Sequence, residues 1–135
     1  MQRRDYLDQQ IEQLGRVLAQ LLSEAIGFKN RSSEATDCVN AVLQKELGWD
    51  TDDLLEIPET QWIETLLATG KFNSANLESF ADLLLWQEKR TDDAKRNKLL
   101  RKCLLIYEHI DKADRIFSAE RQAKITSIRQ KLAGQ

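Results

Sequence analysis

The most constraining feature of the sequence is a stripe of apolar residues that recurs every three or four positions between residues 6 and 26. Its members are Leu7, Ile11, Leu14, Leu18, Leu21 and Ala25. Steps of three and four place side chains on one face of an α-helix, and polar residues fill the opposite face here. The pattern predicts a long amphipathic helix over residues 6–26, whose apolar side must be covered.

The rest of the chain repeats this pattern in shorter pieces. Gly48 and Gly70 follow apolar stripes, where helices commonly end, while Asn73 and Ser118 precede stripes, where helices commonly begin. Further helices are predicted over residues 35–47, 58–68, 73–90, 91–113 and 119–133, with Thr51 capping a short turn. With five glycines and one proline in 135 residues, breakers are scarce. We predict one all-α domain over residues 1–135, with about six helices arranged as stacked antiparallel hairpins.

The predicted helix over residues 73–90 differs from the others because apolar residues cover most of its sides. These are Leu77, Phe80, Ala81, Leu83, Leu84, Leu85 and Trp86. A helix of this kind must be surrounded, so we expect it at the centre of the domain. Trp86 has two interpretations, an internal packing residue or an exposed anchor for a partner. Gly15 in the first predicted helix indicates either a close helix crossing or a loss of helix stability that the apolar stripe tolerates.

The sequence predicts no catalytic residue, no metal ligand and no cofactor. Cys38 and Cys103 lie within apolar helical patterns and are interpreted as reduced, buried residues. His109 is the single histidine, which excludes a zinc site with two histidines. No glycine-rich phosphate loop and no Gly-x-Ser-x-Gly turn is present. The acidic run Asp50, Asp52, Asp53 and Glu56 is interpreted as the start of a helix rather than a calcium site.

Charge is distributed unevenly along the chain. Residues 1–85 carry a net charge of −8 and residues 86–135 a net charge of +6, for a total of −2. In one interpretation the two halves attract each other across the fold or between subunits. In the other, four cations on one side of the 91–113 helix bind an acidic partner or a phosphate backbone: Lys95, Lys98, Arg101 and Lys102. An isoelectric point near 5.5 and the lack of interleaved aromatic residues argue against nucleic acid.

Two groups of residues resemble known proteins. The stretch 80–84 with Leu100, Cys103 and Leu104 resembles a tetratricopeptide-like helix pair, in which bulky and small residues of two helices meet. Residues 5–7 and 11–19, together with 107–111 and 117–121, resemble a family of small, uncharacterised bacterial all-helical proteins. This resemblance implies a tetratricopeptide-like fold in the bacterial cytoplasm and supplies no catalytic residue.

The function we predict is that of a non-catalytic interaction or scaffold module that presents a helical groove to a protein or peptide partner. Aromatic residues and long cations dominate interface energetics, so the candidate partner-binding residues are Tyr6, Trp49, Trp62, Trp86, Lys95, Lys98, Arg101 and Lys102. One alternative is a homodimer or larger homo-oligomer that pairs through the 6–26 helix. Another is a small-ligand-binding protein or enzyme with a pocket between hairpins.

The sequence also predicts where in the cell the protein is located. The longest apolar run, residues 103–107, is far too short to span a bilayer. The N-terminus passes directly into an amphipathic pattern with no apolar signal core. We therefore expect a cytoplasmic protein without a membrane segment.

Overall fold

A computed structural model describes the backbone of residues 2–27 and 32–134, and the side chains of residues 8–24 and 36–134. Within these ranges every regular element is a helix, which confirms the all-α prediction. The α-helices are α1 (Gln2–Gly27), α2 (Ser32–Leu47), α3 (Thr51–Glu56), α4 (Glu59–Ala68), α5 (Ser74–Gln87), α6 (Asp93–Asp114) and α7 (Ala119–Ala133), and a 3₁₀ turn, η1 (Glu88–Arg90), follows α5. The described part thus has one α-helix more than the six predicted.

The additional helix is α3, where the sequence predicts only a short turn capped by Thr51. The cap is instead Asp50, whose Oδ1 accepts the N–H of Asp53 at 2.9 Å while the Asp53 carboxylate accepts the N–H of Asp50 at 3.2 Å. This reciprocal capping box satisfies two N–H groups at the helix start. It confirms the interpretation of these two acids as helix-start residues. Thr51 is buried and bonds to Asn40 and Gln87.

The other helix ends follow the predicted residues closely. Gly48 and Gly70 both have positive φ, at 83° and 72°, where glycine carries no steric penalty. Asn73 and Ser118 cap α5 and α7 through side-chain oxygens. Two ends differ. The helix predicted to reach residue 90 ends at Gln87 and continues as the 3₁₀ turn η1, and α6 is capped by Arg115 in the left-handed conformation, with φ of 55°, that the sequence does not reveal.

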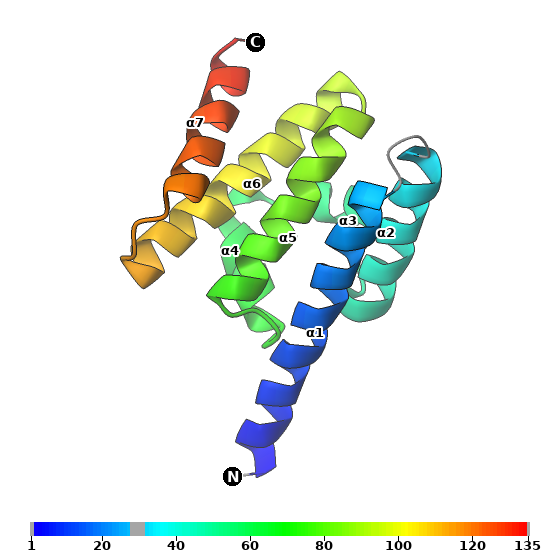
Figure 1. The fold of residues 1–135 in the computed structure, drawn as a ribbon, viewed down its shortest axis with the longest axis vertical. Helices are drawn as coiled ribbons and strands as arrows, with labels where there is room; N and C mark the ends of the chain where they lie inside the picture. The colour runs from blue at the N-terminus through cyan, green and yellow to red at the C-terminus, as the bar shows by residue number, and fades with distance from the viewer. Residues whose placement is uncertain (1, 28–31, 135) are drawn as a thin grey trace.

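The helices are arranged around α5 and α6. Figure 1 shows α5 in the middle, α1 on one side of it and α6 on the other, and α7 beyond α6. The chain direction reverses from α5 to α6 and again from α6 to α7. Helix α6 also contacts α3 and α4, which lie behind α5 in this view. The predicted central position of the 73–90 helix is confirmed, and α6 shares it.

The core is built on the apolar sides of α5. Leu77, Phe80, Ala81, Leu83 and Leu84 are all buried, as expected of a surrounded helix. The Phe80 ring lies 5.3 Å from the ring of Phe72 and 6.2 Å from that of Trp62, measured between centroids. These tilted aromatic contacts join α5 to α4 and to the loop between them.

Helix α1 crosses α5 closely at Gly15. A Cβ atom at Gly15 would lie 2.9 Å from Oδ1 of Asn76, which is too close for an ordinary contact. The amide nitrogen of buried Asn76 donates to the carbonyls of Ile11 and Lys71, each at 2.8 Å. Gly15 therefore permits a close crossing, the first of its two predicted interpretations.

Most of the described apolar stripe of α1 is covered within the chain. Leu14, Leu18 and Leu21 are buried, and α1 contacts both α5 and α2. Leu7 and Ala25 lie outside the described side chains. Ile11, the remaining described member of the stripe, is half-buried, and pairing through this helix stays an alternative prediction.

Both cysteines are free. Cys103 is buried between α5 and α6, and its thiol lies 3.5 Å from the carbonyl of Ala81. Burial raises the pKa of the Cys103 thiol far above its usual value, which keeps it protonated and unreactive. Cys38 is half-buried on α2. Neither residue is in a disulfide, which agrees with the sequence interpretation, but only Cys103 is buried as predicted, because Cys38 lies at the partly exposed edge of its helix stripe.

Candidate functional site

Three of the four singled-out cations of α6 face carboxylates on α3 and at the start of α4. The nitrogen–oxygen distances are 3.0 Å for Lys95 with Asp52, 3.9 Å for Lys98 with Glu56, and 3.8 Å for Arg101 with Glu59. These side chains are largely exposed, so each pair contributes at most about 1 kcal/mol. The contacts agree with the interpretation in which the acidic and basic halves attract each other across the fold.

The fourth cation, Lys102, is buried together with Trp62. The indole N–H of Trp62 donates to the carbonyl of Lys102 at 3.1 Å, and the ammonium of Lys102 lies 4.6 Å from the centroid of the indole ring. The ammonium also donates to the carbonyl of Ile57. Burial lowers the pKa of Lys102. Although the sequence places Trp62 and Lys102 among candidate surface anchors, both are interior residues that join α4 to α6.

A cavity of about 480 Å³ opens beside Lys102, between α6 and the turn that links α3 to α4. Its lining consists of Leu55, Glu56, Ile57, Pro58, Glu59, Asn97, Lys98, Arg101 and Lys102. This volume is within the range of roughly 300–1,000 Å³ that is typical of ligand sites. Three of the predicted partner-binding cations thus line one concave site.

Two predicted aromatic residues lie elsewhere. Trp49 follows α2, half-buried and packed against the core, and it lines neither of the two hollows described here. Tyr6 belongs to α1, but its side chain lies outside the described residues. The structure does not bring Trp49 together with Trp62 or Trp86 in a common site.

Trp86 lies beside a second hollow, of about 460 Å³, between the C-terminal half of α5 and α7. Its lining consists of Asp82, Leu85, Trp86, Glu88, Lys89, Arg90, Lys124 and Lys131. Trp86 is half-buried, and the guanidinium of Arg90 stacks over its indole at 4.1 Å from the ring centroid. Arg90 also donates to the carbonyl of Trp86 at 2.7 Å. We call this hollow the α5–α7 groove.

The α5–α7 groove has a positive charge balance. Four cations line it against two carboxylates, Asp82 and Glu88. The ammonium of Lys131 lies 2.5 Å from the carboxylate of Glu88, which is itself buried. The net charge of the lining is therefore opposite in sign to that of the whole chain, which is −2.

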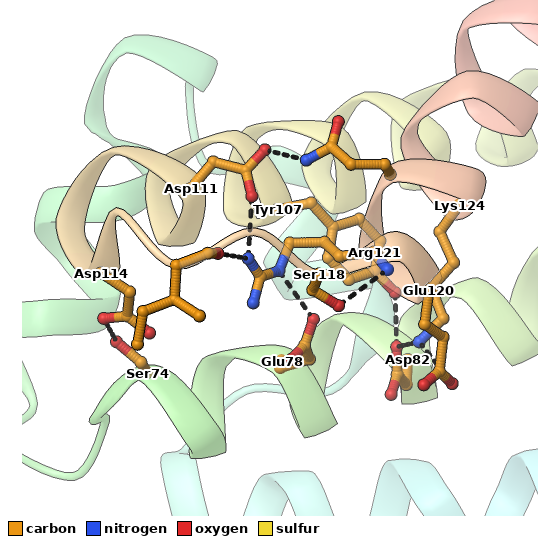
Figure 2. A network of polar contacts seen from close by, with 12 residues as sticks. Ser74, Glu78, Asp82, Tyr107, Asp111, Asp114, Ser118, Glu120, Arg121 and Lys124 are labelled. Carbon is orange, nitrogen blue, oxygen red and sulfur yellow. Dashed lines mark hydrogen bonds and ion pairs between the residues drawn. The ribbon is translucent and has the colours of Figure 1, made fainter.

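One wall of the groove is fixed by hydrogen bonds to Asp82. Figure 2 shows Oδ1 of Asp82 accepting both the Tyr107 hydroxyl, at 2.6 Å, and the ammonium of Lys124, at 2.8 Å. The same ammonium lies 5.7 Å from the centroid of the Tyr107 ring. Burial, and then the bond to Asp82, raise the pKa of Tyr107 far above its usual value. Helices α5, α6 and α7 are thereby tied together at one carboxylate.

Arg121 forms a second tie between the same three helices. Its Nε donates to Glu78 on α5 at 2.9 Å, and its Nη1 donates to Asp111 on α6 at 2.8 Å (Figure 2). Gln122 donates to the other oxygen of Asp111 at 2.6 Å. Burial opposes the charge of Arg121, but the bonds to the two carboxylates outweigh it and raise its pKa. The α7 wall of the groove is held in place by these bonds.

Of the groove residues the sequence predicts only Trp86 as a binding residue, and it does not predict the four cations, Lys89, Arg90, Lys124 and Lys131. They come from η1 and α7, which meet α5 only in the folded chain. Two spacings carry a signal: Arg90 is four residues after Trp86, and Lys124 and Lys131 are seven residues apart. Both spacings place side chains on one helical face. They do not reveal that the two faces meet.

The chain matches no protein-family model, and no characterised protein or solved structure is significantly similar to it. Among the described side chains, no three His, Cys, Asp or Glu residues are grouped in a way that could hold a metal ion. None of the helices in the described ranges combines the length and the apolar composition needed to cross a bilayer. The basis for a functional proposal is therefore the geometry of the two hollows.

Proposed function

We propose that this protein is a non-catalytic interaction module that binds an acidic, amphipathic helix of a partner protein in the α5–α7 groove. The observation that carries the proposal is the position of Trp86, a half-buried indole at the wall of a hollow lined by four cations. Tryptophan is enriched among residues that dominate binding energy. Helical peptides commonly place their apolar face in such grooves.

The charge of the groove selects the kind of helix. Leu85 and Trp86 provide an apolar strip for the apolar face of the partner helix, while the cations of η1 and α7 lie beside it. Carboxylates on the partner would meet Lys89 and Arg90 and would speed association. A basic helix would be repelled by the same groups.

The proposal includes a tetratricopeptide-like arrangement of stacked hairpins and an origin in the bacterial cytoplasm, as the sequence resemblances imply. The thiol of Cys103 lies 3.5 Å from the carbonyl oxygen of Ala81. This contact supports the arrangement, since small residues of two helices meet there. Concave surfaces between stacked helices are the usual binding surfaces of such proteins.

A library of displayed random peptides of about 16 residues, long enough for roughly four helical turns, tests the proposal. We expect selection on the folded protein to return peptides with acidic residues and with apolar residues three and four positions apart. Trp86→Leu keeps an apolar side chain but removes the indole, and it should weaken binding of the selected peptides about tenfold or more. Circular dichroism verifies that the variant is folded.

Charge variants distinguish binding in this groove from general electrostatic attraction to the protein surface. Lys89→Glu should weaken binding by about three- to tenfold, because Lys89 is an exposed residue of the lining. The matched control is Lys112→Glu, which makes the same charge change at an exposed position of α6 outside the groove. Equal effects of the two variants, or selection of peptides without acidic residues, would contradict the proposal.

A further inference from the structure

The cavity beside Lys102 has a wall formed by the start of α4. The N-cap of α4 is Pro58, which has no side-chain oxygen, and no side chain caps this helix. The first N–H groups of any helix have no partner within the helix. The backbone at Glu59 and Thr60 therefore presents uncapped donors at the positive end of the helix dipole. Both Pro58 and Glu59 line the cavity.

A buried cation lies at the same cavity. Lys102 is only 2% exposed, yet the partners of its ammonium are the carbonyl of Ile57 and the face of the Trp62 ring. Neither partner carries a negative charge. No described carboxylate lies within ion-pair distance of this ammonium, although that of Glu59 attracts it from farther away, and a buried charge without a direct ionic partner is costly. An anion in the cavity would supply the missing charge.

Two further cations of the lining are held loosely. Lys98 and Arg101 lie 3.9 and 3.8 Å from Glu56 and Glu59, beyond direct hydrogen-bond distance. Their exposed side chains can turn toward a ligand without breaking a hydrogen bond to these carboxylates. With Lys102, the lining holds three cations and two carboxylates, a net charge of +1.

We propose that this cavity binds a small organic monocarboxylate. Its carboxylate would accept hydrogen bonds from Lys102 and from the uncapped start of α4, and its apolar part would lie against Leu55, Ile57 and Pro58. One negative charge neutralises the lining, whereas a phosphate dianion would leave excess negative charge beside Glu56 and Glu59. In this proposal the cations of α6 bind a small carboxylate, whereas one interpretation of the sequence has them bind a phosphate backbone.

The test is a titration of the ¹⁵N-labelled protein with sodium hexanoate, followed by two-dimensional NMR at constant ionic strength. We expect saturable shifts of the Glu59 and Thr60 amides and of the Trp62 indole N–H, which donates to the Lys102 carbonyl. The dissociation constant should be about 1 mM or lower, as is reasonable for a ligand of this size. Hexylammonium, with the same number of carbon atoms and the opposite charge, should give no saturable shift.

Variants of the cavity residues test whether hexanoate binds in this cavity. Lys102→Met removes the ammonium and keeps the chain length, and it should weaken hexanoate binding about tenfold or more. Lys95→Met is the matched control, because Lys95 is on the same helix, pairs with Asp52 and lies outside the cavity. It should leave the affinity unchanged. Arg101→Gln, at an exposed position, should weaken binding about two- to fivefold, so it provides a second readout if Lys102→Met does not fold.

Three outcomes would overturn the proposal. The first is the absence of saturation up to about 50 mM hexanoate, which excludes a specific site of useful affinity. The second is equal affinity in the wild type and in both cavity variants. The third is displacement of hexanoate by inorganic phosphate at lower concentration, which would assign the cavity to phosphate groups.

Discussion

Trp62 and Lys102 contact each other twice. The indole N–H of Trp62 donates to the backbone carbonyl of Lys102, and the Lys102 ammonium lies over the indole ring. A single pair of residues thus links α4 to α6 through a hydrogen bond and a cation–π contact. This arrangement explains how a lysine side chain is accommodated in the interior, at the expense of a lowered pKa.

The lowered pKa of Lys102 predicts a pH dependence of stability. The unfolded chain keeps this proton up to about pH 10.5, while the folded chain releases it at lower pH. Between the two pKa values the unfolded state binds more protons, so this group makes the fold more stable as pH rises. Relative to Lys102→Met, the wild type should gain up to about 1.4 kcal/mol per pH unit in this window. Urea unfolding of both proteins from pH 7 to pH 10 measures the difference, and a constant difference would contradict the prediction.

Tyr107 predicts the opposite dependence at higher pH. Its pKa is raised in the fold, so above about pH 10 the unfolded chain loses the phenolic proton while the folded chain retains it. Stability contributed by Tyr107 is therefore complete below pH 10 and is lost as pH rises further. Tyr107→Phe should cost about 1–2 kcal/mol at pH 7, through the lost bond to Asp82, and should flatten the alkaline decline. Unfolding curves at pH 7 and pH 11 test both expectations.

Arg121 should be among the most sensitive positions in the chain. Arg121→Met leaves Glu78 and Asp111 without their shared partner and should lower the free energy of unfolding by about 2–4 kcal/mol. Arg129→Met is the control, since Arg129 forms an exposed pair with Glu108 and should lose less than about 1 kcal/mol. Urea unfolding gives the free energies. Equal losses for the two variants would show that burial of the Arg121 network does not matter.

The close crossing at Gly15 predicts that the effect of Gly15→Ala on stability depends on the side chain at position 76. Alanine favours an isolated helix by about 1 kcal/mol over glycine, but the new Cβ would lie 2.9 Å from Oδ1 of Asn76. Because two carbonyls hold the Asn76 amide, we expect Gly15→Ala to destabilise the fold by about 1–2 kcal/mol. In the Asn76→Ala background the same change should become stabilising. A double-mutant cycle measured by thermal unfolding decides the point, and additive effects would refute the steric explanation.

Much of the fold could be predicted from the sequence because its signals are local. Apolar spacing and capping residues such as Asn73 and Ser118 act within a few positions of the chain, so they define helices directly. The sequence does not predict helix α3, because six residues are too few for a periodic pattern. It does not predict the left-handed conformation of Arg115, because an arginine by its residue type does not favour positive φ.

The candidate sites could be predicted only in part, because a site depends on which helices meet. The shared helical face of the α6 cations can be predicted from their spacing, but the burial of Lys102 depends on the indole of Trp62 and the turn at Ile57. The sequence indicates Trp86 through its position on α5, while the cations that accompany it in the groove belong partly to α7. Spacing along one helix carries no information about such neighbours.

The position of α7 depends on a guanidinium shared between two other helices. Because Arg121 serves Glu78 and Asp111 at once, its replacement leaves two carboxylates without their shared cation, and replacement of either carboxylate removes one of the two ion pairs of a buried guanidinium. Evolution can therefore alter this junction only through concerted replacements. In related chains, positions 78, 111 and 121 should change together or stay the same, a constraint that links three distant parts of the gene.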